Sequence, residues 1–272
     1  RAPVAGQHAG SQRRDGFGQV GGVGLGGVGP GGVRGRGGHR ATVGDPVVRS
    51  GECARTGPAL RCPAMATRNL YLHETVDIVG QGQYDYMACV TREPTNVMPD
   101  MLTLQGTFFV CAVGGGRWPQ VVNIWDVGDQ GWRGWAANVD RLNLKRRNAF
   151  YGDWWDEAAQ WRTGGFDRLC GGVPGSPTTG ELAAGGVRGT LFVHQLLTVR
   201  PGCPLDYLAA VVEEQVPLWR EYGHEPTGIY EVLGNQHEVV VVWASSISAQ
   251  TRLRAARDAA RGLADGADAD DR

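Results

Sequence analysis

The chain has 272 residues, enough for one large domain or two small ones, and a formal net charge of −1. Hydrophobic residues make up 42% of it, which is sufficient for a core and excludes a chain that is disordered throughout. It contains no run of 18 apolar residues, so we expect no membrane span. Glycine is abundant, and arginine almost completely replaces lysine, a bias typical of a GC-rich bacterial genome.

Residues 1–64 differ in composition from the rest of the chain. They contain 18 of the 43 glycines and nine arginines against three acidic residues, without an apolar period of 2 or 3.6 residues. Such a segment cannot bury enough apolar surface to offset chain entropy, so we expect it to be disordered. Met65 is the first methionine. We therefore interpret 1–64 as a leader or an upstream reading frame, outside the natural product.

Two other interpretations of this segment are open. A Gly/Arg tail could bind nucleic acid, but such tails interleave aromatic residues and Phe17 is the only one here. Gly22, Gly24 and Gly27 fit a dinucleotide-binding G-x-G-x-x-G pattern. No strand pattern precedes it and no helix pattern follows, so the match reflects glycine density. We expect no nucleic-acid partner.

After Met65 the chain repeats itself. Leu70–Ala88 aligns without a gap on Leu191–Ala209, with identical residues at five of nineteen positions. The identical pairs are Leu70/Leu191, His73/His194, Asp85/Asp206, Tyr86/Tyr207 and Ala88/Ala209. An apolar run then ends at Trp125 in the first copy and at Trp243 in the second. Two copies of one supersecondary unit explain this pattern, and we expect them to superpose with His73 on His194 and Trp125 on Trp243.

Each copy predicts the same order of elements. The first copy predicts a strand (70–79), a helix (84–91), a hairpin (107–113 with 121–127), helices (132–142 and 154–162) and a closing strand near 166–170. The second predicts a strand (191–200), a helix (205–222), a hairpin (228–233 with 238–243) and a helix (249–263). The order β-α-β-β-α-β is that of a ferredoxin-like unit.

We therefore predict an α+β fold of two tandem ferredoxin-like units, at 68–175 and 188–264, followed by an acidic tail at 265–272. The second unit lacks an evident closing strand. Either the chain is truncated there, or an edge is left for another subunit to cover, as in a homodimer.

The segments YLHETVDIV, GRWPQVVNIWDV and FVHQLLTVRPG resemble the NIPSNAP-type branch of the dimeric α/β-barrel superfamily. The resemblance covers about Leu70 to Trp243. The family's turn of valine, a basic residue and Pro-Gly survives at Val199–Gly202 and is degraded at Val79–Gly82. The resemblance implies two ferredoxin-like sheets face to face in an α/β barrel. It implies no reaction, because the fold hosts isomerases, cofactor-free oxygenases, haem enzymes and proteins without a known activity.

His73 and His194 occupy equivalent positions in the middle of strands. Because alternate residues of a strand share a face, His73 lies with Tyr71 on the less aliphatic face, which we expect to line the barrel. A cavity there, with at least one histidine at its wall, would allow a general base or a haem ligand. The alternative is a hydrogen-bonded packing histidine that duplication has repeated. Glu74 and Gln195 lie on the other face, where a carboxylate needs a partner, and become the cavity residues if the faces are reversed.

Seven of the nine tryptophans lie within 118–161, which indicates a core or dimer face, or an aromatic wall around a flat ligand. The sequence contains no nucleophile elbow and no zinc, Walker or EF-hand spacing. We expect a small apolar or aromatic ligand in the barrel, without a cofactor or metal. The candidate binding residues are His73, His194, Glu74, Gln195, Tyr71, Trp125 and Trp243.

Two alternatives to this ligand-binding hypothesis are a cofactor-independent isomerase or oxygenase and a non-enzymatic protein-interaction module. The sequence shows neither paired carboxylates nor a nucleophile–base pair, which favours a protein without enzymatic activity. A histidine-lined cavity would favour ligand binding, whereas a barrel centre filled by side chains would favour the interaction module. We expect a cytoplasmic protein without a membrane partner.

A chain that starts at Met65 should fold like the full chain, because the residues removed are not expected to contribute to a core. We expect the same far-UV circular dichroism per folded domain and a cooperative melting transition. Loss of cooperative melting in the shortened chain would contradict the leader interpretation.

Overall fold

The computed structural model describes residues 21–24, 68–92, 102–110, 117–128, 130–145, 153 and 156–263. The first unit consists of β2 (Leu70–Ile78), α1 (Gln83–Thr91), β3 (Thr103–Val110), β4 (Gln120–Gly128), α2 (Gly131–Lys145) and β5 (Arg162–Gly172). After α4 (Thr179–Ala184), the second unit consists of β6 (Leu191–Thr198), α5 (Pro204–Ala210), the π-helical turn η1 (Val211–Gln215), α6 (Val216–Glu221), β7 (Glu225–Val232), β8 (Glu238–Ser245) and α7 (Ile247–Ala260). The predicted α+β fold of two tandem ferredoxin-like units is confirmed.

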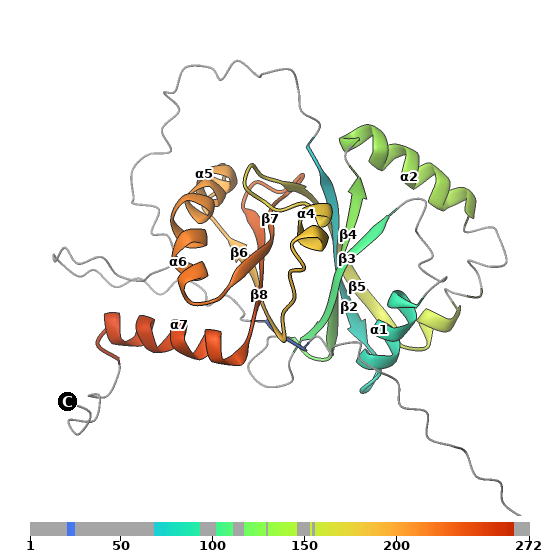
Figure 1. The fold of residues 1–272 in the computed structure, drawn as a ribbon. Coiled ribbons are helices and arrows are strands. Elements are labelled where there is room, and N and C mark those ends of the chain that lie inside the picture. Colours follow the sequence, from blue (N-terminus) through green and yellow to red (C-terminus); the bar gives the residue numbers. More distant parts are fainter. Residues whose placement is uncertain are drawn as a thin grey trace, which may run out of the picture.

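The strands form one closed barrel in the order β1-β3-β4-β2-β5-β7-β8-β6. From β3 to β6 all neighbouring strands are antiparallel. The closing strand β5 joins the two units, because it pairs with β2 along its whole length and with β7 through Cys170–Gly172. This double pairing explains why β5 is longer than the predicted strand at 166–170. Figure 1 shows the strands in the middle, with α1 and α2 on one side and α5, α6 and α7 on the other.

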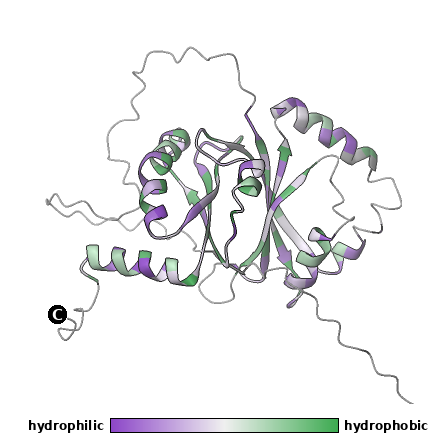
Figure 2. Ribbon diagram, viewed as in Figure 1, coloured by the Kyte–Doolittle hydropathy of each residue, from purple (hydrophilic) through white to green (hydrophobic). Residues whose placement is uncertain are grey.

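Side chains of the described residues pack in three separate cores. The first fills the space between the first unit's sheet and α1 and includes Val76, Tyr86 and Trp125. The second lies between the second unit's sheet and its helices and includes Leu208, Trp219, Trp243 and Leu253. The third is the barrel interior and includes Tyr71, Phe108, Ile124, Tyr230 and Val242. Figure 2 shows hydrophobic positions running through the central strands. Hydrophilic and hydrophobic residues both occur along the helices, as expected for helices that cover a core with one face.

The two units share one register. In the first hairpin the pairing of β3 with β4 shifts between Leu104 and Gly106, and in the second the pairing of β7 with β8 shifts between Pro226 and Gly228. His73 lies opposite Ile124, and His194 lies opposite Val242 at the corresponding place. Trp125 and Trp243 likewise lie opposite the residue that precedes each histidine. The expected superposition of the two units therefore holds strand by strand.

The short strand β1 (Gly21–Gly24) runs parallel to both β6 and β3 and closes the barrel between them. In the first unit the closing strand β5 pairs with β2, and β6 is the equivalent of β2. β1 therefore occupies the position of the closing strand that the second unit lacks. The edges of β3 and β6 need hydrogen-bond partners, and β1 supplies them.

The prediction that 1–64 has no secondary structure is therefore wrong for Gly21–Gly24, where the exposed edges of two strands provide pairing partners that local sequence does not reveal. The edge that we expected another subunit to cover is the one that β1 covers. A chain that starts at Met65 lacks β1, so the expectation that it folds like the full chain is corrected: the edges of β3 and β6 would lose these pairing partners. The other residues of 1–64 lie outside the described residues, so their disorder stays a prediction. The predicted acidic tail at 265–272 and the first residues of the predicted helix at 154–162 also lie outside them.

The two bulge glycines provide a matched pair for testing the packing of the interior. A Cβ atom at Gly228 would overlap the ring of Tyr230, whereas a Cβ at Gly106 would meet no atom within 4 Å. We expect Gly228→Ala to lower the free energy of unfolding by about 1–3 kcal/mol, the usual cost of overpacking. Gly106→Ala should change it little. Equal effects in urea denaturation would contradict this description of the interior.

Candidate functional site

The centre of the barrel contains a contact between the two equivalent histidines. Nε2 of His73 lies 2.9 Å from Nε2 of His194, and the rings stack with centroids 5.0 Å apart. His73 is fully buried, and His194 is 8% exposed. The histidine-bearing face of each strand is therefore the inner one. The alternative assignment, with Glu74 and Gln195 inside the barrel, is wrong, because these side chains lie on the outer face with the tryptophans described below.

Aromatic pairs flank the histidines and follow the same internal symmetry. Tyr71 of the first unit packs on Tyr230 of the second at 4.7 Å, and Phe192 of the second stacks on Phe108 of the first at 5.4 Å. Tyr71 and Phe192 are equivalent by the alignment, and Phe108 and Tyr230 are equivalent by register. Each unit thus inserts the same two positions into the other, and the middle of the barrel is occupied by side chains.

Both histidines are held neutral. Burial lowers the pKa of His73 well below its usual value, and the neighbouring His194 and Arg168 lower it further. The pKa of His194 is lowered to about 4, first by burial and then by the positive charge of Arg168. Two neutral rings that share a hydrogen bond between Nε2 atoms must differ in tautomer, since one ring donates and the other accepts. Because the bond uses Nε2 of each ring, the geometry favours packing over service as a general base or a haem ligand.

The positive charge comes from a half-buried ion pair. Arg168 on β5 lies directly opposite His73 in the β2–β5 pairing, and its guanidinium packs over the Phe166 ring at 4.5 Å. Its Nε lies 3.1 Å from Oε2 of Glu238 at the start of β8, and its Nη2 donates to Oε1 of Glu238. Sequence reasoning missed this pair. The only signal was that Arg168 alternates with Phe166 and Cys170 along the predicted closing strand.

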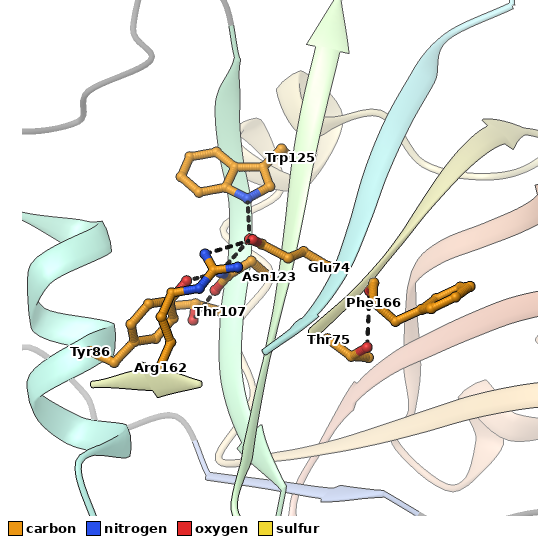
Figure 3. A network of polar contacts seen from close by, with 8 residues as sticks. All are labelled: Glu74, Thr75, Tyr86, Thr107, Asn123, Trp125, Arg162 and Phe166. Carbon is orange, nitrogen blue, oxygen red and sulfur yellow. Dashed lines mark hydrogen bonds and ion pairs between the residues drawn. The ribbon is translucent and has the colours of Figure 1, made fainter. Parts of the chain in front are cut away.

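Glu74 lies on the outer face of the first sheet, within the network of Figure 3. Its Oε2 accepts hydrogen bonds from Asn123 Nδ2 at 2.9 Å and from Trp125 Nε1 at 3.2 Å, and Arg162 lies 3.3 Å from its Oε1. Thr107 donates to Oδ1 of the same asparagine, whose Nδ2 also reaches the hydroxyl of Tyr86. Burial, and next the Glu74 charge, raise the pKa of Tyr86. The partner that a carboxylate needs on this face is therefore present.

The second unit keeps the simplest part of this network. Gln195, the equivalent of Glu74, accepts a hydrogen bond from Trp243 Nε1 at 2.8 Å. Val241 stands where the first unit has Asn123. Of the predicted binding residues, His73, His194 and Tyr71 therefore point into the barrel, whereas Glu74, Gln195, Trp125 and Trp243 bond to one another in pairs between the sheets and the helices.

A cavity of about 420 Å³ opens at the end of the barrel between β3 and α4. Its lining is Thr103, Leu104, Gln105, Gly106, Thr107, Phe108, Ile124, Thr179, Leu182, Ala183, Val187, Arg188, Gly189, Phe192, Thr227 and Val242. Neither histidine nor any tryptophan is among these residues. Phe108 links the cavity to the centre, because its ring packs edge-on against His194 at 5.7 Å.

Two local features fix this end of the barrel. α4 begins with a capping box in which Thr178 and Glu181 bond reciprocally. Gln105, at the bulge of the first hairpin, donates to the Thr227 carbonyl and the Tyr230 hydroxyl and accepts from Thr179 at 3.0 Å. Sequence reasoning missed the cavity and α4. The pattern Thr-x-x-Glu at 178–181 was a usable signal for the helix.

None of the described tryptophans lines this cavity. Trp125 and Trp161 belong to the first core, and Trp132 packs edge-on against Trp135 on α2 at 5.6 Å. Trp154 and Trp155 lie outside the described residues. Within the described part of the chain, no group of three or more His, Cys, Asp or Glu residues is placed to hold a metal ion. No helix there has the length and apolar character needed to cross a membrane.

No family model matches the chain, and no curated protein matches it. Among solved structures, it is similar to a NIPSNAP domain protein from Burkholderia xenovorans, with 14% identity, a TM-score of 0.34 and coverage of 40% of this chain and 99% of that one. It is also similar to a "putative monooxygenase" from Fusobacterium nucleatum, with 10% identity, a TM-score of 0.43 and coverage of 70% of this chain and 82% of that one. A "putative monooxygenase" from Lactobacillus acidophilus matches at 10% identity and a TM-score of 0.42, covering 73% and 88% of the two chains. A NIPSNAP domain protein, the kind of protein that the sequence resembles, is thus among the solved structures to which the chain is similar.

The neutral histidine pair predicts a specific dependence of stability on pH. In the unfolded chain both rings take up protons near pH 6.5, whereas in the folded protein His194 does so only near pH 4 and His73 well below its usual pKa. The stabilising effect of burying neutral rings is therefore complete above pH 6.5 and is lost as the pH falls towards 4. Between pH 7 and 5.5, protonation of each histidine in the unfolded chain lowers the free energy of unfolding by roughly 1 kcal/mol.

Replacing both rings should remove this contribution. In His73→Phe/His194→Phe the ring stack is retained, and we expect the pH dependence of the free energy of unfolding between pH 7 and 5.5 to shrink by about 2 kcal/mol. Buried His224, whose pKa is also lowered by burial, leaves a smaller dependence in the variant. Urea denaturation at several pH values measures the difference. An unchanged pH dependence would show that the two histidines titrate in the folded protein with the same pKa as in the unfolded chain.

Proposed function

We propose that the protein binds a small apolar or aromatic ligand in the cavity between β3 and α4. The observation that carries the proposal is the cavity itself: about 420 Å³, within the usual range for small-molecule sites, and walled largely by apolar side chains. The predicted ligand is thus retained, but at the end of the barrel instead of at the two histidines.

The walls suit a compact or flat ligand. Phe108 and Phe192 stack almost parallel, at an interplanar angle of 4°, and both belong to the lining. Leu182 and Ala183 of α4 belong to the same lining. Aromatic faces favour offset stacking with a ring, and aliphatic side chains cover it without demanding hydrogen bonds.

The lining offers little for acid–base catalysis. Among the described residues around the cavity there is no carboxylate, histidine or cysteine. This composition supports binding over catalysis and disfavours the isomerase or oxygenase alternative, which would need such a group or a reactive ligand. A cytoplasmic location, expected from the sequence, belongs to the same proposal.

A protein-interaction module is the second candidate. It is supported by the barrel centre, which is filled by side chains, as expected for a barrel that holds no ligand at its middle. Trp132 and Leu144 of α2, 58% and 68% exposed, are the kind of apolar surface that a partner covers. The same surface supports a homodimer as part of this candidate.

Two neighbouring alanines of α4 allow a direct test of the cavity. Ala183 belongs to its lining, whereas Ala184 does not, and both are exposed enough to accept a larger side chain. We expect Ala183→Trp to fill the cavity and abolish the binding of 2-naphthylmethanol, a neutral flat probe, measured by isothermal titration calorimetry. Ala184→Trp should bind the probe like the parent. Binding of the probe that survives Ala183→Trp would refute ligand binding in this cavity.

A further inference from the structure

We infer that the ligand of this cavity carries a carboxylate, bound by Arg188, at one end of its apolar body. The inference rests on the proposed function and specifies the class of ligand. It follows from two features of the lining. Most of its neutral polar side chains have no free hydrogen-bond donor, and it contains one positively charged residue.

Four of the five neutral polar side chains of the lining have already committed their donors, and the fifth, Thr103, offers one exposed hydroxyl. Both N–H groups of the Gln105 amide are used, on the Thr227 carbonyl and the Tyr230 hydroxyl. Thr179 donates to the Gln105 amide oxygen, and Thr107 donates to Asn123. Thr227 donates to the carbonyl of Val242. A ligand group that needs donors therefore has little to find in this part of the wall.

Arg188 is the charged residue of the lining, and most of its donors make no hydrogen bond to a described residue. Of its five N–H groups, Nη1 donates to the carbonyl of the preceding Val187 at 2.9 Å. No ion pair of Arg188 occurs within the described residues. It is the one charged residue among the described residues of the lining, so the cavity presents a single unneutralised positive charge beside an apolar wall.

The acidic groups on neighbouring elements are engaged elsewhere. The carboxylate of Glu181 on α4 accepts from the backbone and hydroxyl of Thr178 at the helix N-terminus. Glu231 on β7 pairs with Arg68 at 2.6 Å. Both interactions satisfy these carboxylates locally, which leaves the guanidinium of Arg188 available for a ligand.

A monocarboxylate fits this arrangement. A guanidinium binds a carboxylate through two parallel N–H···O bonds, and such charge-assisted bonds are about twice as strong as neutral ones. The lining supplies one positive charge, which matches a carboxylate better than a dianionic phosphate. The inferred ligand is therefore an amphipathic acid with an aromatic or short aliphatic body that lies against Phe108 and Phe192.

A matched pair of probes tests the inference on the full chain. 2-Naphthoate and 2-naphthylmethanol share one ring system and differ in the charge of the polar end. By isothermal titration calorimetry we expect the parent to bind the carboxylate at least tenfold more tightly than the alcohol. Arg188→Gln should bind the carboxylate and the alcohol with similar affinity, and Arg188→Lys should retain part of the preference for the carboxylate.

The outcomes separate this inference from the function on which it rests. If both probes bind the parent equally, or Arg188→Gln leaves the preference unchanged, the carboxylate inference is overturned while ligand binding stands. If neither probe binds the parent, both fail. Loss of both probes in Ala183→Trp, together with loss of only the carboxylate preference in Arg188→Gln, supports both.

Discussion

The hydrogen bond between His73 and His194 is the contact on which the arrangement of this barrel depends. It joins equivalent residues of the two units at the point where their sheets meet, with Nε2 atoms 2.9 Å apart. A buried polar ring without a partner costs free energy, so each histidine needs the other unit in place. The aromatic pairs that flank them, Tyr71 with Tyr230 and Phe108 with Phe192, repeat the same exchange between units.

This hydrogen bond also determines which part of the barrel is open to a ligand. Burial and the Arg168 charge keep both rings neutral, and the bond occupies a nitrogen of each. The middle of the barrel is therefore filled by side chains that join the two units. The open volume lies at one end, under α4, where the walls are apolar and Arg188 supplies the charge. The proposed site is therefore close to the histidines through Phe108 but is not built from them.

Much of the fold was predictable because strand periodicity and duplication are local or self-similar signals. The alignment of His73 with His194 placed both on one strand face, and the aliphatic opposite face identified the side that the helices cover. The same periodicity showed that Glu74 needed a partner on that outer face. It could not name Asn123 or Arg162, because those contacts depend on how β4 and β5 pair with β2. Similarly, the place of Gly21–Gly24 depends on two strand edges more than 80 residues away in sequence.

The candidate site was less predictable than the fold. Sequence patterns indicated which residues face inward but not that the two histidines would meet each other instead of lining a space. A cavity is the volume that packing leaves, so it depends on side chains from β3, α4 and β6 together. Arg188 carried no signal of its own, since an arginine in a glycine-rich loop is ordinary until its neighbours are known.

The most direct test of this account is the protonation state of the two central histidines in the folded protein. Nitrogen-15 NMR of histidine-labelled protein reports the tautomer and the charge of each ring, and variants with single substitutions assign the signals. The account predicts that at pH 5.5 both rings are neutral, with one protonated at Nε2 and the other at Nδ1. Titration of either ring near pH 6.5, or the same tautomer in both, would contradict it.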